Sequence, residues 1–128
     1  MKNFFRSILV VIIATLSVAS ASIPVDARAA RPGSYDGTWS VVIYTLRGDC
    51  SSGLRYAVRI AGGRVFSEDA NYRAAGAVGA GGAIRVTVAQ GNTAASGFGR
   101  LTRDAGRGQW RTSSGRCSGE WTAERRPW

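Results

Sequence analysis

From Tyr35 onward the chain consists of short runs in which apolar and polar residues alternate, each bounded by Gly, Asn, Asp or Ser. No stretch shows the sustained 3.6-residue apolar period of an amphipathic helix. A period of two is typical of strands, because successive side chains of a strand point to opposite faces of a sheet. The sequence therefore predicts an all-β domain.

Eight strands are predicted, over 39–46, 54–60, 65–67, 71–78, 84–88 and 95–101, in a short run around Trp110, and over 119–124. The residues expected to face inward are Trp39, Val41, Ile43, Leu54, Tyr56, Val58, Ile60, Tyr72, Ala74, Gly76, Val78, Ile84, Val86, Val88, Ala95, Gly97, Gly99, Leu101, Trp110, Gly119, Trp121 and Ala123. The stretch 76–82 is glycine-rich like a phosphate-binding loop, but no Lys-Ser/Thr pair follows it, which favours a hairpin turn.

Short turns between all the strands imply antiparallel pairing in chain order. An up-and-down meander of this length hides its edges most simply by closing into a small barrel. Small inward residues on two of the strands allow the barrel to flatten, or allow a large residue from across to fill the space.

Cys50 and Cys117 are the only cysteines. In an oxidising compartment, an isolated pair in a small domain predicts a disulfide, since metal or redox use lacks further ligands and a C-x-x-C spacing. Cys50 follows the first predicted strand and Cys117 precedes the last. In a closed barrel these strands are neighbours, so the bridge is expected at the seam.

Residues 1–21 read as a signal peptide: Lys2 and Arg6 precede an apolar run and the small triplet at 19–21. Cleavage after residue 29 is an alternative. Residues 22–35 read as a flexible lead-in and 36–126 as a single barrel domain. The apolar run is too short to span a bilayer comfortably, which predicts a mature chain without a transmembrane segment, in the periplasm or secreted.

All 15 basic residues beyond the predicted leader are arginines, against 8 acidic residues. Guanidinium groups form forked hydrogen bonds to anions, although codon bias and solubility explain such a composition too. A candidate binding surface consists of outward-facing aromatic residues and arginines: Tyr44, Phe66, Phe98, Arg55, Arg59, Arg73, Arg85 and Arg100. The alternative is that these are scattered surface residues without a function. The expected partner is a protein or an anionic envelope polymer, with no specific nucleic acid.

No catalytic constellation is found. The chain contains no His, which excludes Ser-His and Cys-His pairs, and two cysteines alone do not make a zinc site. The adjacent carboxylates of Glu68 and Asp69 read as an ordinary turn. We therefore expect a non-enzymatic protein without a cofactor.

Residues 35–39 (YDGTW) resemble the Gly-x-Trp opening of lipocalin and avidin-like barrels. Together with 47–50 (RGDC), 56–60 (YAVRI) and 117–125 (CSGEWTAER), they resemble small exported bacterial proteins sometimes labelled haem-utilisation exoproteins. Without His or an internal Met, and with bridged cysteines, only Tyr would ligate iron. A more distant resemblance is to the avidin-like barrels of periplasmic protease inhibitors.

The expected function is that of an exported binding barrel, with inhibition of exported hydrolases as its sharper form. The alternative is an envelope-associated protein that binds anionic polymer or lipopolysaccharide through its arginines. The barrel interior separates the broader possibilities: a lined cavity favours a small ligand, and a filled interior favours a surface function.

Overall fold

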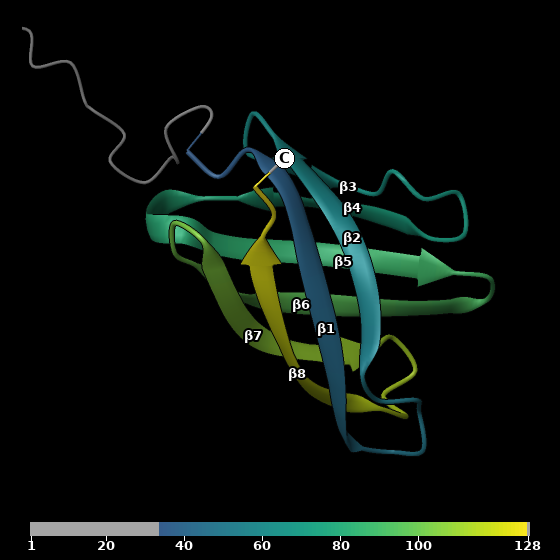
Figure 1. Cartoon of the computed structure of the whole chain (residues 1–128). Helices are drawn as coiled ribbons and strands as arrows, with labels where there is room; N and C mark the ends of the chain where they lie inside the picture. Colours follow the sequence, from purple (N-terminus) through teal and green to yellow (C-terminus); the bar gives the residue numbers. More distant parts are fainter. Residues whose placement is uncertain (1–33, 128) are drawn as a thin grey trace, which may run out of the picture.

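A computed structural model describes residues 34–127 of the chain (Figure 1). Its strands are β1 (Gly37–Arg47), β2 (Leu54–Ala61), β3 (Arg64–Phe66), β4 (Arg73–Val78), β5 (Ala83–Gln90), β6 (Thr93–Leu101), β7 (Ala105–Thr112) and β8 (Ser118–Arg125), with one 3₁₀ turn, η1 (Ala80–Gly82). Each strand pairs antiparallel with the next, and β8 pairs with β1 to close the barrel. The predicted all-β, eight-stranded, up-and-down barrel is confirmed. The predicted signal peptide, and all of the lead-in before residue 34, lie outside the described residues.

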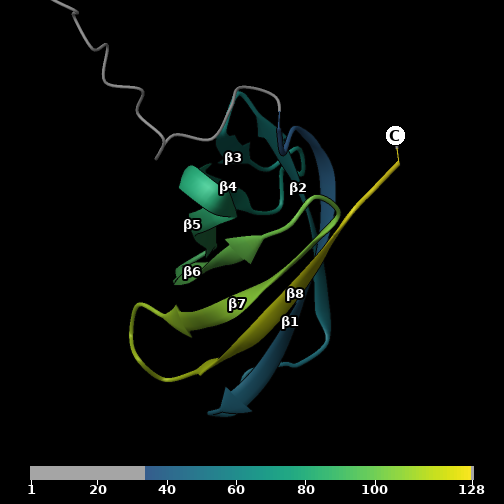
Figure 2. The ribbon, with the colours of Figure 1, turned by 90° about the vertical axis from the view of Figure 1, so that its left-hand side faces the viewer.

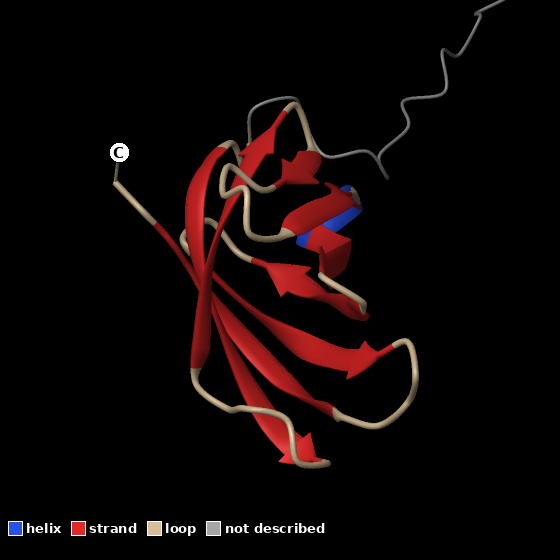
Figure 3. Ribbon diagram, turned by 90° about the vertical axis from the view of Figure 1, so that its right-hand side faces the viewer, coloured by secondary structure: helices blue, strands red, loops and turns tan. Residues whose placement is uncertain are grey.

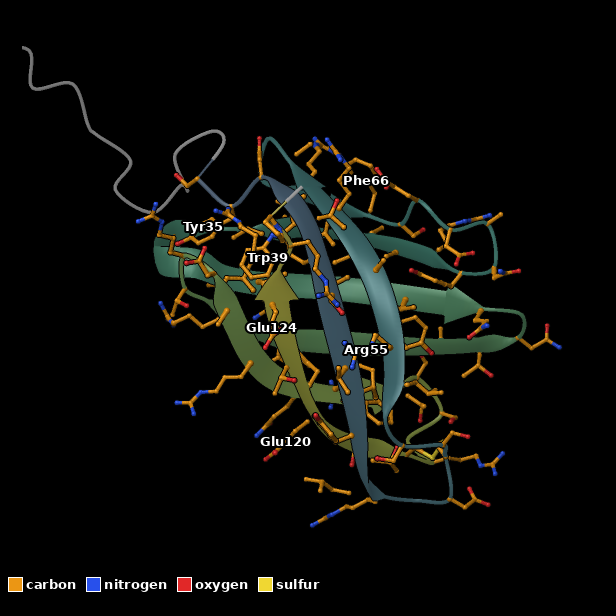
Figure 4. The ribbon with its side chains drawn as sticks, in the orientation of Figure 1. Tyr35, Trp39, Arg55, Phe66, Glu120 and Glu124 are labelled. Atoms are coloured by element: carbon orange, nitrogen blue, oxygen red, sulfur yellow. A yellow bond between two sulfur atoms is a disulfide. The ribbon has the colours of Figure 1, made fainter. Side chains whose placement is uncertain are left out.

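One end of the barrel, which we call the closed end, is filled by side chains. Trp39, Ile60, Val65, Val78, Ile84 and Leu101 are all buried there. Tyr35 packs against this cluster, and its main-chain oxygen accepts a hydrogen bond of 2.9 Å from the Trp39 indole (Figure 4). Figure 2 looks toward this end, with η1 at its edge. The glycine-rich stretch 76–82 thus forms the end of β4 and a tight turn, as expected.

The small inward residues of β6 and β7 make room for one large ring. Side-chain atoms placed on Gly99 or Gly108 would lie 2.7 Å from the indole of Trp121, which projects from β8 across β7. The Trp121 indole donates to the main-chain oxygens of Gln109, at 3.1 Å, and Phe98, at 3.3 Å. The ring therefore lies flat on bare backbone. The large residue that covers these small ones comes from the neighbouring strand β8 and not, as the sequence allowed, from across the barrel.

The region between β3 and β4 departs from the predicted strands. Ser67 lies after β3 rather than in it, and β4 begins at Arg73 rather than at residue 71. The Ser67 hydroxyl donates to the main-chain oxygen of Tyr72, at 2.8 Å, and accepts from the amide of Ala74. A side chain thus replaces strand pairing, and residues 67–72 form a loop.

Tyr72, expected among the inward residues, instead bridges a gap in the barrel wall. β3 pairs only with residues 59–61 of β2, so the preceding part of β2 has no strand partner on that side. The Tyr72 hydroxyl accepts a 2.9 Å hydrogen bond from the Ala57 amide and donates to the Ala57 oxygen. Its ring meets that of Tyr56 edge-on, with centroids 5.0 Å apart. Burial raises the pKa of Tyr72, so its hydroxyl keeps its proton well above neutral pH.

Replacing Tyr72 by Phe is expected to lower the free energy of unfolding by about 1–2 kcal/mol, because both polar groups of Ala57 lose their partner. The Ala57 amide should then exchange with solvent faster, which native-state hydrogen exchange detects. Tyr44→Phe removes an exposed hydroxyl and is the control. Equal stability loss in both variants would contradict the bridging role.

The disulfide joins Cys50 to Cys117 with their Cα atoms 6.1 Å apart. Cys50 lies in the loop after β1 and Cys117 immediately before β8, and β1 and β8 pair from Trp39–Arg125 to Arg47–Ser118. The predicted staple at the seam is confirmed. A disulfide agrees with an oxidising compartment. Within residues 34–127, no helix is both long enough and apolar enough to cross a membrane.

Candidate functional site

The barrel encloses an apolar cavity of about 350 Å³. Its wall consists of inward residues from every strand except β4, together with part of the β1–β2 loop and with Ser96, whose side chain is on the outward face of β6. The lining residues are Trp39, Val41, Ile43, Cys50, Ser51, Leu54, Tyr56, Val58, Ile60, Val65, Ile84, Val86, Val88, Thr93, Ala95, Ser96, Gly97, Leu101, Trp110, Thr112, Trp121 and Ala123. No charged side chain is among them. The inward faces of β1, β2, β5, β6 and β8 are those that alternation predicts.

The cavity opens at the end opposite the closed one, which we call the mouth. It is bordered by loops 48–53, 67–72, 91–92 and 113–117, and Figure 3 looks toward it. Along β2, exposure of the inward residues rises from 1% at Ile60 to 43% at Leu54, where the strand reaches the mouth. On β5, Ile84 is buried while Val86 and Val88 are half-buried. Inward apolar side chains near the mouth thus face space that an apolar guest would fill.

Three tryptophans present only carbon to this space. The indole N–H of Trp39 is bonded to Tyr35, and that of Trp121 to β6 and β7 as described above. The Trp110 indole donates to the main-chain oxygens of Tyr44, at 3.0 Å, and Glu120, at 3.2 Å. Each indole donor is satisfied by backbone, so a guest receives no hydrogen bond from the rings.

Polar lining atoms gather toward the mouth. Ser51 lies in the mouth loop and Thr93 begins β6 at the same end. Thr112 is buried, and its hydroxyl donates to the Cys117 oxygen and accepts from the Cys117 amide. The deep part of the cavity is therefore apolar and the rim carries hydroxyls.

The loop 48–53 is fixed over one side of the mouth. The Thr45 hydroxyl donates to the Ser51 oxygen and the Thr45 amide donates to the Ser52 hydroxyl, both at 3.0 Å. The disulfide ties the same loop to the loop 113–117, immediately before β8. Asp49 lies beside the two sulfur atoms and pairs with Arg116 at 3.4 Å. Bridged sulfurs are not thiolates, so this cluster is not a metal site.

The cavity does not fit haem. An apolar cavity of about 150 Å³ holds benzene, so one of this size takes on the order of 14 non-hydrogen atoms, far fewer than a substituted porphyrin contains. Tyr56 is the only tyrosine in the lining. The iron chemistry implied by the resemblance finds no support in this geometry.

The predicted surface residues divide between two walls of the barrel. Tyr44, Arg55 and Arg59 lie on β1 and β2, where Arg55 donates to the Ser40 hydroxyl at 3.3 Å and Arg59 pairs with Glu68 at 3.6 Å. Figure 4 shows Arg55 on this wall, with Glu120 and Glu124 on neighbouring β8. The aromatic residues Tyr44, Phe66 and Phe98 are exposed, as expected.

The second wall carries the remaining predicted surface residues. Arg73, Arg85, Phe98 and Arg100 project from β4, β5 and β6, with Arg85 directly opposite Phe98. The structure adds Arg107 and Arg111 on β7, which sequence reasoning did not select. Their signal is the alternation of Arg107, Gln109 and Arg111 with Gly106, Gly108 and Trp110.

No protein-family model matches this chain, and no curated protein or solved structure is significantly similar to it.

Proposed function

We propose that the protein binds a small, uncharged and largely apolar molecule in the cavity of its barrel. The observation that carries this proposal is the gradient of exposure along the inward face of β2. Toward the mouth the inward apolar side chains are partly exposed, and they line a cavity of about 350 Å³. Water finds few polar partners in a space walled by indole and aliphatic carbon, whereas an apolar guest removes its own apolar surface and that of the wall from water. Binding pockets of small-molecule proteins begin at roughly this size.

The lining defines the class of guest. Absence of charged groups from the wall disfavours a buried ion, because an unpaired charge in an apolar site is strongly penalised. The hydroxyls at the rim accommodate a single alcohol, ether or carbonyl group. The proposed guest has on the order of 14 non-hydrogen atoms and enters apolar end first.

This proposal is the small-ligand form of an exported, non-enzymatic binding barrel. Inhibition of exported hydrolases is a further proposal. The periplasmic protease inhibitors that the chain resembles act through a reactive N-terminal segment, and the corresponding residues 22–34 lie almost wholly outside the described residues. Periplasmic or secreted location likewise rests on the predicted signal peptide, with the disulfide in agreement.

Filling the cavity is expected to weaken binding strongly. Val88 lines it from the mouth half of β5, so Val88→Trp places an indole in the space of the guest. Thr87→Trp adds a similar ring to the outward face of the same strand. Calorimetric titration with a C10–C12 primary alcohol should show at least a tenfold weaker affinity for Val88→Trp and an unchanged affinity for Thr87→Trp.

Equal affinity in the wild-type and Val88→Trp proteins would remove the cavity as the binding site. A carboxylate of the same chain length is the second titrant. If it binds more tightly than the alcohol, the proposal of an uncharged guest is wrong.

A further inference from the structure

The outward face of β4–β7, which we call the basic face, carries five arginines and no acidic residue. Its outward residues are Arg73, Ala75, Ala77, Ala83, Arg85, Thr87, Ala89, Ala94, Ser96, Phe98, Arg100, Ala105, Arg107, Gln109 and Arg111. The adjoining strand β8 presents Glu120 and Glu124 instead. Positive charge is thus concentrated on one wall, although the arginines are spread along the sequence.

The five arginines are exposed, and none of them is neutralised within the described chain. The two ion pairs found in residues 34–127 are those of Arg59 with Glu68 and Arg116 with Asp49, on other parts of the surface. Arg100 donates to the main-chain oxygen of Gly81 at 3.0 Å, which orients its guanidinium without balancing the charge. Each group keeps donors for an anionic partner.

The strand register places like charges together. Arg100 on β6 is directly opposite Arg107 on β7. Side chains directly opposite on antiparallel strands have Cβ atoms about 5 Å apart, and like charges there are destabilising. An anionic group bound by both guanidiniums would relieve this repulsion, because each guanidinium forms forked hydrogen bonds to carboxylate, sulfate or phosphate.

The surface between the arginines is low and carries one aromatic ring. Six of the outward residues are alanines, so the long arginine side chains border a shallow floor. Phe98 is 50% exposed near the centre, opposite Arg85 on one side and Gln109 on the other. The face of an aromatic ring is negative and attracts the C–H groups on the apolar side of a sugar ring. Four strands span about 15 Å, the length of a few sugar units.

We propose that the basic face binds an acidic polysaccharide, with its anionic groups on the arginines and a sugar ring against Phe98. This site is separate from the cavity and independent of the function proposed for it. Charge complementarity carries the proposal, and the exposed ring among the arginines favours a sugar polymer over a bare ion. An exported location, as the sequence predicts, would bring the face into contact with such polymers.

The test compares two variants that lose the same charge. Arg85→Gln/Arg107→Gln/Arg111→Gln removes three arginines from the basic face, and Arg47→Gln/Arg55→Gln/Arg59→Gln removes three from the β1–β2 wall. Binding to heparin and to polygalacturonate is measured across a range of salt concentrations. We expect the first variant to bind at least tenfold more weakly, with a slope of log K against log salt reduced by about 2–3, and the second to change less than threefold. Phe98→Ala should weaken binding without changing the slope.

Each other outcome overturns the proposal. Equal losses in the two triple variants would show that net charge alone attracts the polymer. Failure of the wild-type protein to bind either polysaccharide at low salt would show that the face is not a polyanion site. Tighter binding of a single-stranded oligonucleotide than of either polysaccharide would assign the face to nucleic acid. Far-ultraviolet circular dichroism and a thermal unfolding transition like those of the wild-type protein check that the triple variants are folded.

Discussion

Replacing Cys50 and Cys117 by alanine is expected to lower the free energy of unfolding by about 4 kcal/mol. The bridge joins residues that are 67 apart in sequence. In the chain-entropy account, closing a loop of that length lowers the conformational entropy of the unfolded chain, which stabilises the folded state by about this free energy. A domain of this size is stable by only about 5–15 kcal/mol. Thermal or denaturant unfolding of the two forms measures the difference.

The dithiothreitol-reduced wild-type protein is the control for this pair of substitutions. The reduced protein keeps both cysteine side chains, whereas the alanine variant truncates them. One of them, the Cys117 side chain, is buried and only 1% exposed. We expect the reduced protein to lose nearly as much stability as the alanine variant. A loss below about 1 kcal/mol in both forms would show that the strand pairing of β1 with β8 holds the seam without the bridge.

Substituting Gly99 by alanine is expected to cost about 3 kcal/mol, because overpacking in a close-packed interior forces backbone or ring to move. The added methyl group would overlap the main-chain oxygen of Arg107 on the next strand, and it would lie 2.6 Å from the Cα of Gly108 and 2.7 Å from the Trp121 ring. None of these can retreat easily: the backbone of β7 is held by strand pairing and the ring by two hydrogen bonds. The unfolding free energy in denaturant measures the cost.

Gly97→Ala is the matched control, two residues earlier on the same face of β6. The nearest atoms to its added methyl group are the Val86 Cγ1 at 3.3 Å and the Trp121 Nε1 at 3.5 Å. A small shift of Val86 accommodates it, so the change in stability should stay below about 1 kcal/mol. Similar losses at both positions would mean that β6 needs glycine for a reason other than these close contacts at Gly99.

The barrel was predictable because its causes are local. Alternation with a period of two marks the inward side chains, and glycine pairs such as Gly62–Gly63 mark the turns. The placement of Cys50 and Cys117 beside the first and last strands added the one long-range relation that the sequence shows. Closure then follows from the need to cover two sheet edges.

The β3–β4 region was predicted less well because side chains there replace main-chain pairing. Ser67 and Tyr72 form hydrogen bonds with backbone that a strand neighbour would otherwise satisfy. Alternation places Tyr72 on the inner face, but its hydroxyl reaches Ala57, fifteen residues away in sequence. Such contacts between distant residues leave no periodic signal.

Alternation identifies which side chains face inward, but not whether they meet in the middle. The inward indoles of Trp39, Trp110 and Trp121 are all buried core residues. Toward the mouth, Trp121 lies flat against glycines rather than across the interior, which leaves the cavity open. The basic face was not predicted from the sequence for a similar reason, because only the pairing register shows that Arg100 and Arg107 are opposite each other.

The three indoles whose N–H groups are bonded to backbone also give the molecule an optical property. Trp39, Trp110 and Trp121 all line the cavity, so any occupant touches or approaches the protein's own fluorophores. Their hydrogen bonds are to the protein and not to water, so arrival of an apolar molecule changes the polarity around the rings without changing their bonding. Ultraviolet emission from the unlabelled barrel is thus expected to shift to shorter wavelength as the interior fills.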